Sequence, residues 1–138
     1  MFSKIMVPVD LAHLDSQERA LDCGAGLAGF YGATMVFVGV TTEMPDPIAH
    51  SSAEYAEKLK MFAQEQATRR EVGASSHVMI AHDPTVDLDD ALLRAVNETG
   101  SDFVVMASHD PGIAEYIWPS NGGKLASHSH ASVLVVRG

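Results

Sequence analysis

Residues 35–40, Met-Val-Phe-Val-Gly-Val, form an unbroken apolar run made largely of residues that favour β-strands. Comparable runs occur at 5–9, 77–81, 103–107 and 133–136. A strand with one face in water alternates apolar and polar residues, whereas a strand covered on both faces reads as a continuous apolar run. The sequence therefore predicts five strands in a sheet that is covered on both of its faces.

Helical segments separate these strands along the chain. The predicted helices span residues 15–31, 53–72, 88–97 and 121–127. Asp15-Ser-Gln-Glu18 matches a capping box at the start of the first helix, and Gly32 and Gly73 are the expected ends of the first and second. The alternation of strand and helix predicts an α/β fold with a doubly wound, mostly parallel sheet and helices on both faces. Residues 1–138 show no internal boundary, so we expect one domain.

Composition limits the kinds of partner that the chain can bind. The formal net charge of −9 leaves few groups to neutralise the phosphates of nucleic acids or anionic membranes. The first ten residues read as a strand rather than a signal peptide, and no apolar run reaches the roughly 20 residues that span a bilayer. The single cysteine, Cys23, excludes an internal disulfide and fits a reducing compartment. We expect a cytoplasmic protein that binds neither nucleic acid nor membrane.

Polar residues follow two of the predicted strands. Asp10 follows the first strand, and Ser108-His109-Asp110 follows the fourth. In open parallel sheets, ligands bind beyond the carboxyl ends of the strands at a switch point, so these two ends form the candidate site. Ser120-Asn121-Gly122-Gly123 then opens a helix, whose free N–H groups and dipole suit an anion. The alternative interpretation is that Ser120 is simply a helix cap.

Two stretches of the chain resemble a known family. Met6-Val-Pro-Val-Asp10 and the tail from Ala107 to Arg137 are similar to the universal stress proteins, and the resemblance covers essentially the whole chain. Within the tail, the matching residues are Ala107-Ser108-His109, Pro111, Tyr116, Ser120-Asn121, His128 and Val133-Leu134-Val135-Val136-Arg137. The resemblance implies a five-stranded parallel sheet in the order 3-2-1-4-5, with a crevice between the first and fourth strands. It also implies a stress-response module that binds an adenine nucleotide, ATP or AMP/ADP.

The resemblance assigns roles to residues around that crevice. Asp10 matches an acid on the adenosine side, with Pro8 and Val9 lining the site. Val40 matches the strand end whose backbone meets the adenine. The positions matched to ribose and phosphate binding are Ala107, His109, Ser120 and Asn121. The full set of expected nucleotide-binding residues is Pro8, Val9, Asp10, Val40, Met106, Ala107, His109, Asp110, Pro119, Ser120, Asn121 and Gly122.

The phosphate-binding loop departs from the family pattern. Ala107 stands at the first glycine of the usual loop, Asp110 stands at the second, and Pro119 replaces the glycine before the serine. A carboxylate near a triphosphate is unfavourable unless a metal bridges the two, and proline removes a backbone donor. Mg²⁺ carried by the nucleotide near Asp10 or Asp110 would relieve the repulsion, whereas we expect no metal held by the protein alone. AMP, ADP or an empty site stays open beside ATP.

Two patterns that suggest catalysis or a metal site fail on geometry. Ser108-His109-Asp110 has the composition of a hydrolase triad, but triads assemble in space and neighbouring strand residues point in different directions. His128 and His130 fall at a helix end and turn, and no four-ligand metal spacing appears. We therefore expect no catalytic residue, and the question of an enzymatic activity stays open.

Three functions remain compatible with the sequence. The first is a module whose affinity for a protein partner changes with the bound adenine nucleotide. The second is a slow ATP-hydrolysing or self-phosphorylating protein, slow because the chain lacks a P-loop lysine and an evident catalytic base. The third is an interaction protein with a degenerate, empty site.

The last predicted strand indicates self-association. Val133, Leu134, Val135 and Val136 are apolar and lie at one end of the predicted sheet. An exposed strand edge invites pairing with another chain. The resemblance implies the same, because relatives dimerise through their last strand. We expect a homodimer through these four residues, in addition to an unidentified protein partner.

Overall fold

The computed structural model describes residues 1–108 and 121–137. Five parallel strands form one sheet in the order β3-β2-β1-β4-β5. The strands are β1 (Lys4–Pro8), β2 (Thr34–Thr41), β3 (Ala74–Ile80), β4 (Phe103–Ala107) and β5 (Ser132–Val136). The predicted fold class and strand order are confirmed.

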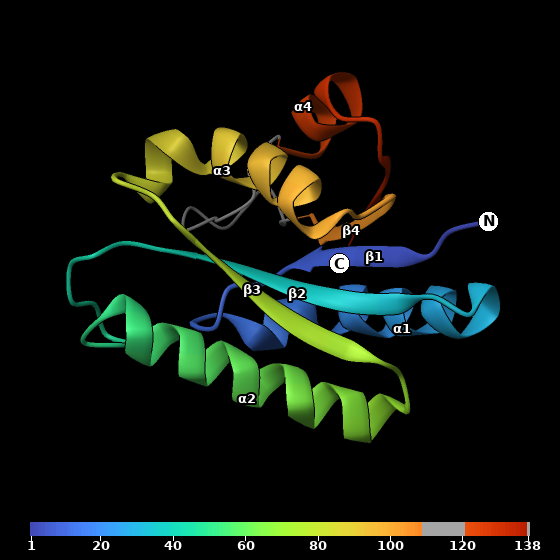
Figure 1. Cartoon of the computed structure of the whole chain (residues 1–138), viewed down its shortest axis with the longest axis horizontal. Coiled ribbons are helices and arrows are strands. Elements are labelled where there is room, and N and C mark those ends of the chain that lie inside the picture. Colours follow the sequence, from blue (N-terminus) through green and yellow to red (C-terminus); the bar gives the residue numbers. More distant parts are fainter. Residues whose placement is uncertain (109–120, 138) are drawn as a thin grey trace.

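The helices lie in two layers, one on each face of the sheet (Figure 1). They are α1 (Glu18–Tyr31), α2 (Ser52–Arg70), α3 (Pro84–Thr99) and α4 (Asn121–His128), and a short 3₁₀ turn, η1 (Leu14–Gln17), precedes α1. On one face, α1 packs against β1 and β4 and α2 against β2 and β3. On the other face, α3 packs against β2 and β3, and α4 packs against β5 and α3. This arrangement follows from right-handed crossovers that run outward from β1 in both directions.

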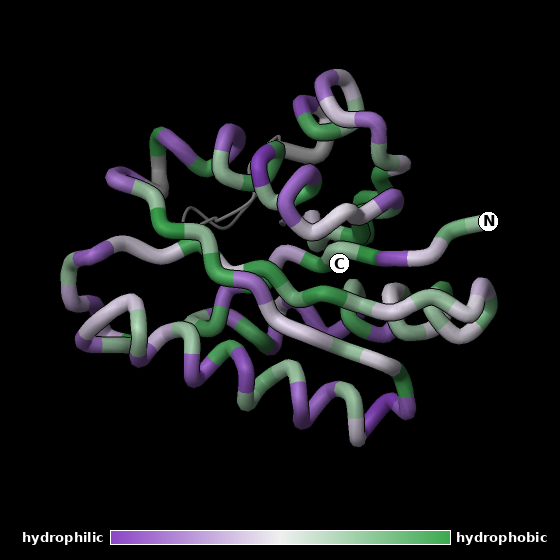
Figure 2. Tube along the Cα trace, in the orientation of Figure 1, coloured by the Kyte–Doolittle hydropathy of each residue, from purple (hydrophilic) through white to green (hydrophobic). Residues whose placement is uncertain are grey.

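The core runs through the three central strands, β2, β1 and β4, and Figure 2 shows the trace of β2 as largely hydrophobic. Ile5, Met6 and Phe37 are fully buried, and Val104 and Val105 are equally buried in β4. Each such side chain contributes about 1.5–3 kcal/mol through burial. The continuous apolar runs are therefore explained: both faces of these strands meet helices.

The first two helices end in left-handed residues. Gly32 follows α1 with a φ of 66°, and its N–H donates to the Ala28 carbonyl, as the sequence predicted. The predicted end of α2 at Gly73 is wrong, because Glu71 already takes the left-handed conformation with a φ of 54°. Gly73 instead leads into β3, where its carbonyl accepts the N–H of Met35.

The predicted capping box at 15–18 is also wrong. Residues 14–17 form the 3₁₀ turn η1, and α1 begins at Glu18 with no side-chain cap. The capping pair lies instead at the start of α2. The N–H of Glu54 donates to Ser51 Oγ at 3.1 Å, and Glu54 Oε2 accepts the N–H of His50 at 3.1 Å. That backbone hydrogen bond from His50 lowers the pKa of Glu54.

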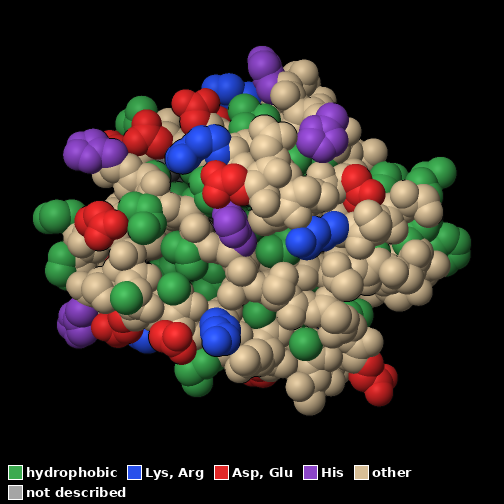
Figure 3. Space-filling model, viewed as in Figure 1, with side chains coloured by type: hydrophobic (Ala, Val, Ile, Leu, Met, Phe, Trp, Pro, Cys, Tyr) green, Lys and Arg blue, Asp and Glu red, His purple; other side chains and the backbone are tan. Residues whose placement is uncertain are grey.

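The visible surface mixes the two signs of charge. In Figure 3, acidic and basic side chains are interspersed with apolar atoms and histidines. Among the residues whose exposure is described, the large apolar ones that stay exposed are Met1, Phe30, Met44, Met61, Ile80, Val86 and Val135. No helix within residues 1–108 and 121–137 has the length and apolar character needed to cross a membrane.

Candidate functional site

The sheet opens between β1 and β4 at the carboxyl ends of these strands. The β1–β4 ladder joins Ile5 to Phe103 and Met6 to Val104 and then stops. The β1–β2 and β4–β5 ladders continue to the last residue of β1 and of β4. We call this opening the β1/β4 split. It coincides with the point where strand order reverses, which is where open α/β sheets bind ligands.

Pro8 explains why the ladder stops there. Successive residues of a strand point their N–H groups to opposite neighbours, and the N–H of Val9 donates to the Val38 carbonyl of β2 at 2.9 Å. Position 8 therefore faces β4, but proline has no N–H to donate. On the other side, the N–H of Ser108 donates to the Val136 carbonyl at 2.8 Å and keeps β4 attached to β5. The strands diverge because β1 lacks its next donor towards β4.

Gln17 fixes the backbone of Asp10 at the carboxyl end of β1. The N–H of Asp10 donates to Gln17 Oε1 at 2.9 Å, and Gln17 Nε2 donates to the Asp10 carbonyl at 2.9 Å. Gln17 Nε2 also donates to the His13 carbonyl at 2.8 Å. Gln17 is only 4% exposed, so this amide is a structural part of the site. Sequence reasoning missed it, and the only signal was an amide side chain shortly after a strand-end acid.

Two hydrogen bonds hold the Asp10 carboxylate. Oδ1 accepts the N–H of Ala12 at 3.0 Å, and Oδ2 lies 2.5 Å from His13 Nδ1. A carboxylate offers about four acceptor positions, and the described residues, 1–108 and 121–137, occupy two of those of Asp10. The structure therefore leaves Asp10 as an oriented, partly occupied acceptor. His13 is a second residue that sequence reasoning missed.

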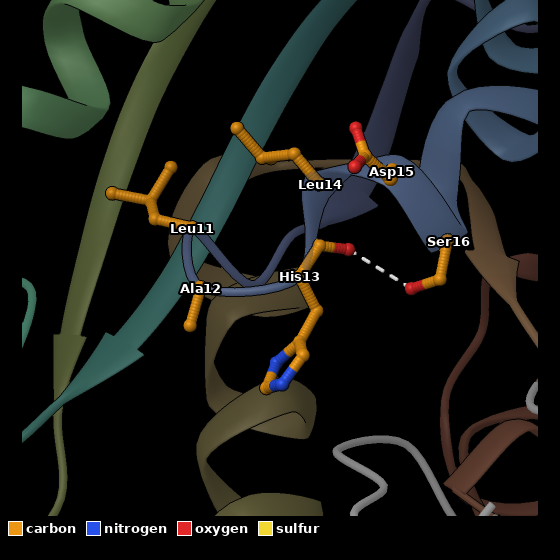
Figure 4. A pocket seen from close by; sticks show the side chains of 6 residues that line it. All are labelled: Leu11, Ala12, His13, Leu14, Asp15 and Ser16. Atoms are coloured by element: carbon orange, nitrogen blue, oxygen red, sulfur yellow. Dashed lines mark hydrogen bonds between the residues drawn. The ribbon is translucent and has the colours of Figure 1, made fainter.

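The turn that follows Asp10 borders an open hollow of about 410 Å³. It is lined by Leu11, Ala12, His13, Leu14, Asp15 and Ser16. Figure 4 shows the side chains of Leu11 and Leu14 on one side of the turn and the His13 ring on the other. Ser16 Oγ donates to the His13 carbonyl at 2.9 Å, which closes the turn. The hollow is in the size range of small-molecule pockets.

Tyr55 closes the end of β2 from the α2 side. A Cβ atom at Gly39 would lie 2.4 Å from Tyr55 Oη, so only glycine lets the ring rest on this backbone. Tyr55 is 5% exposed, and burial together with the carboxylates of Asp10 and Asp46 raises its pKa. The phenol therefore stays protonated over the ordinary pH range. It is the third residue near the strand ends that sequence reasoning missed.

The predicted site residues divide into two groups. Six lie at the carboxyl ends of β1, β2 and β4: Pro8, Val9, Asp10, Val40, Met106 and Ala107. Asn121 and Gly122 are the first residues of α4, and a Lys124–Asp89 ion pair of 3.3 Å links that helix to α3. The predicted residues His109, Asp110, Pro119 and Ser120 lie outside the described part of the chain. The assignment of both groups to nucleotide binding stays a prediction.

Comparison with known proteins gives concordant results. The model of the universal stress protein family matches residues 1–137. Universal stress protein G of Shigella flexneri is 24% identical over 148 residues, covering 99% of this chain and 100% of that protein. A universal stress protein family structure from Burkholderia pseudomallei has a TM-score of 0.69 and 26% identity, covering 97% of this chain and 95% of that one.

Some similar structures contain nucleotides. A family protein from Arabidopsis thaliana with AMP bound has a TM-score of 0.70 and 16% identity, covering 98% of this chain and 91% of that one. Another similar structure, from Archaeoglobus fulgidus, is in complex with dAMP, and a further one is in complex with cAMP. Together, the family match over nearly the whole chain and the shared strand order show that this chain belongs to the universal stress protein family.

Proposed function

We propose that this chain binds an adenine nucleotide at the β1/β4 split and changes its affinity for a protein partner accordingly. One observation carries the proposal: Asp10, whose backbone is held by Gln17 and whose carboxylate accepts the Ala12 N–H, follows β1 at the switch point of the sheet. The similar structures that hold AMP, dAMP and cAMP support an adenine nucleotide as the ligand.

The chemistry of the described residues orients such a ligand. The Asp10 carboxylate is an acceptor, so it suits the hydroxyl or amino donors of a nucleoside and repels phosphates. Val40, half-buried at the end of β2, presents backbone groups to the base edge. The first N–H groups of α4 have no acceptor within the helix itself and suit phosphates. The nucleoside would therefore lie towards β1 and β2, with the phosphates towards α4.

The charge of the protein favours fewer phosphates. With a net charge of −9, which includes Asp110 of the predicted phosphate loop, each added phosphate is penalised electrostatically. We therefore propose AMP as the better ligand without divalent metal, and we expect Mg²⁺ to improve ATP binding more than AMP binding. Mg²⁺ would be held mainly by the phosphates, as is usual for a magnesium ion that accompanies a nucleotide.

The proposal is tested by identifying the ligand that the protein carries. The full-length protein is purified at low salt without added nucleotide and denatured, and the released small molecules are analysed by mass spectrometry. We expect AMP or another adenine nucleotide. Protein stripped of ligand is then titrated with AMP and with GMP as a control. If no adenine nucleotide is released and AMP produces no more binding heat than GMP, the proposal is wrong.

A further inference from the structure

We propose that His13 is a positioning residue of this site, one that fixes the Asp10 carboxylate in the orientation that a nucleoside requires. The inference rests on the proposed function. His13 Nδ1 lies 2.5 Å from Asp10 Oδ2, a short charge-assisted contact between residues three apart on one turn. Asp10 follows β1 at the β1/β4 split, and His13 lines the hollow at residues 11–16.

The other contacts of Asp10 hold its backbone and one carboxylate oxygen but leave the carboxylate plane able to rotate. Gln17 holds both the N–H and the carbonyl of Asp10, so its backbone cannot turn. The Ala12 N–H binds only Oδ1, and one hydrogen bond still lets the carboxylate plane rotate. The second contact, from His13 to Oδ2, fixes that plane. A ligand then finds its acceptors already in place, which lowers the entropic cost of binding.

The exposure of the His13 side chain indicates that its role is to position Asp10 rather than to stabilise the fold. The His13 side chain is 46% exposed, whereas that of Asp10 is 17% exposed. A half-exposed ring adds little to the core, and a surface contact of this kind contributes little to stability. The principal effect of His13 is therefore on the geometry of Asp10.

The contact also fixes the state of the imidazole ring. An ionised carboxylate only accepts hydrogen bonds, so Nδ1 must carry a proton. In the neutral ring, Nε2 is then left as an acceptor. Two substitutions distinguish the roles of the two ring nitrogens. The side-chain amide of asparagine reaches the position of Nδ1, and that of glutamine reaches the position of Nε2. The substitutions His13→Asn and His13→Gln therefore test which nitrogen matters.

The experiment compares AMP affinity and ring state in these variants. We expect His13→Gln to weaken AMP binding about threefold to tenfold, and His13→Asn to retain more of the affinity, because it can still donate to Asp10. The free energy of unfolding should be similar in all three proteins. His130→Gln, an exposed histidine before β5 at the opposite end of the sheet, is the matched control and should bind AMP like the wild type.

Two further readouts make the outcomes distinct. Nitrogen-15 NMR of the ligand-free protein should show the Nδ1–H tautomer for His13, and Asp10→Asn should abolish that preference. In the Asp10→Asn background, His13→Gln should have no further effect on AMP binding. If the wild type binds AMP and His13→Gln binds it equally well, or if the ring lacks the Nδ1–H tautomer, the inference is wrong while the proposed function stands. AMP, ADP and ATP are each titrated into the wild type, and if it binds none of them, both are wrong.

Discussion

At the scale of single residues, Asp102 shows how one carboxylate organises the amino edge of the sheet. Its oxygens accept the N–H groups of Ser3 and Lys4 and the Ser3 hydroxyl, at 3.0–3.2 Å. Burial opposes ionisation, but these hydrogen bonds outweigh it and lower the pKa of Asp102. Asp102 therefore fastens the residues that enter β1 to those that enter β4, on the edge opposite the split.

Replacing Asp102 should lower stability in a pH-dependent way. Because the folded-state pKa is below the ordinary value of 3.8, the stabilisation is present above that value and is lost as the pH falls through the folded-state pKa. We expect Asp102→Asn to lower the free energy of unfolding by about 1 kcal/mol at pH 7, and the difference to shrink below about pH 4. Urea denaturation of the two proteins at pH 7 and again below about pH 4 measures this difference in the free energy of unfolding. Asp90→Asn, at an exposed position in α3, should show no comparable loss, and an equal loss there would contradict the role of Asp102.

At the scale of elements, two glycines differ in whether the surrounding structure leaves space for a Cβ atom. In β2, a Cβ at Gly39 would lie 2.4 Å from Tyr55 Oη and 2.7 Å from Tyr55 Cε1. In α1, a Cβ at Gly26 would meet nothing within 4 Å. The same substitution should therefore have opposite effects in the two elements.

Gly39→Ala and its matched control Gly26→Ala test this difference in packing. Gly39→Ala should lower the free energy of unfolding by about 1–3 kcal/mol, because α2 must shift away from β2. Gly26→Ala should raise it by about 0.5–1 kcal/mol, because alanine favours the helix. Adding Tyr55→Phe to Gly39→Ala removes the nearest atom and should recover part of the loss. A Gly39→Ala protein as stable as the wild type in urea denaturation would show that Tyr55 does not rest on this strand.

Some of these elements follow from the sequence and others do not. The strands were predictable because burial on both faces imposes a continuous apolar run, as at 35–40. The turn after β1 was not, because the pattern Asp15-x-x-Glu18 fits a capping box as well as Ser51-x-x-Glu54 does, and only the second is used. The decisive contact is the amide of Gln17, which returns to a backbone seven residues earlier. A contact of this kind depends on the three-dimensional path of the turn, which the residue pattern does not specify.

At the scale of the whole molecule, the strand order was implied by family resemblance, whereas the two helical layers follow from crossover handedness. The carboxyl edge between β1 and β4 is predictable from the sequence, because Asp10 and Ser108 mark the polar ends of two apolar runs. The split itself is not predictable, because it depends on position 8 facing β4, where Pro8 has no N–H to donate. His13, Gln17 and Tyr55 escaped prediction because their roles depend on packing rather than on a motif.

The expected dimer is a prediction at this scale. The N–H of Ser132 donates to the Asp102 carbonyl and the carbonyl of Val136 accepts from Ser108, so alternate residues of β5 face β4. The N–H of Val135 therefore points away from the sheet, and its side chain is 43% exposed. Val135→Pro should weaken an edge-to-edge dimer without breaking the β4–β5 ladder. Val135→Ala keeps the backbone N–H and should therefore dimerise more strongly than Val135→Pro. Light scattering at micromolar concentration measures this, and a monomeric wild type would contradict it.

The central claim, that an adenine nucleotide binds at the β1/β4 split through Asp10, is tested most directly by calorimetric titration of AMP into the wild type and Asp10→Asn. The variant should fold normally, because Gln17 holds the backbone of residue 10 and an asparagine oxygen can still accept the Ala12 N–H. We predict an affinity about tenfold to a hundredfold lower in the variant, as expected for losing hydrogen bonds to a charged group. Equal AMP affinity in the two proteins would contradict the claim.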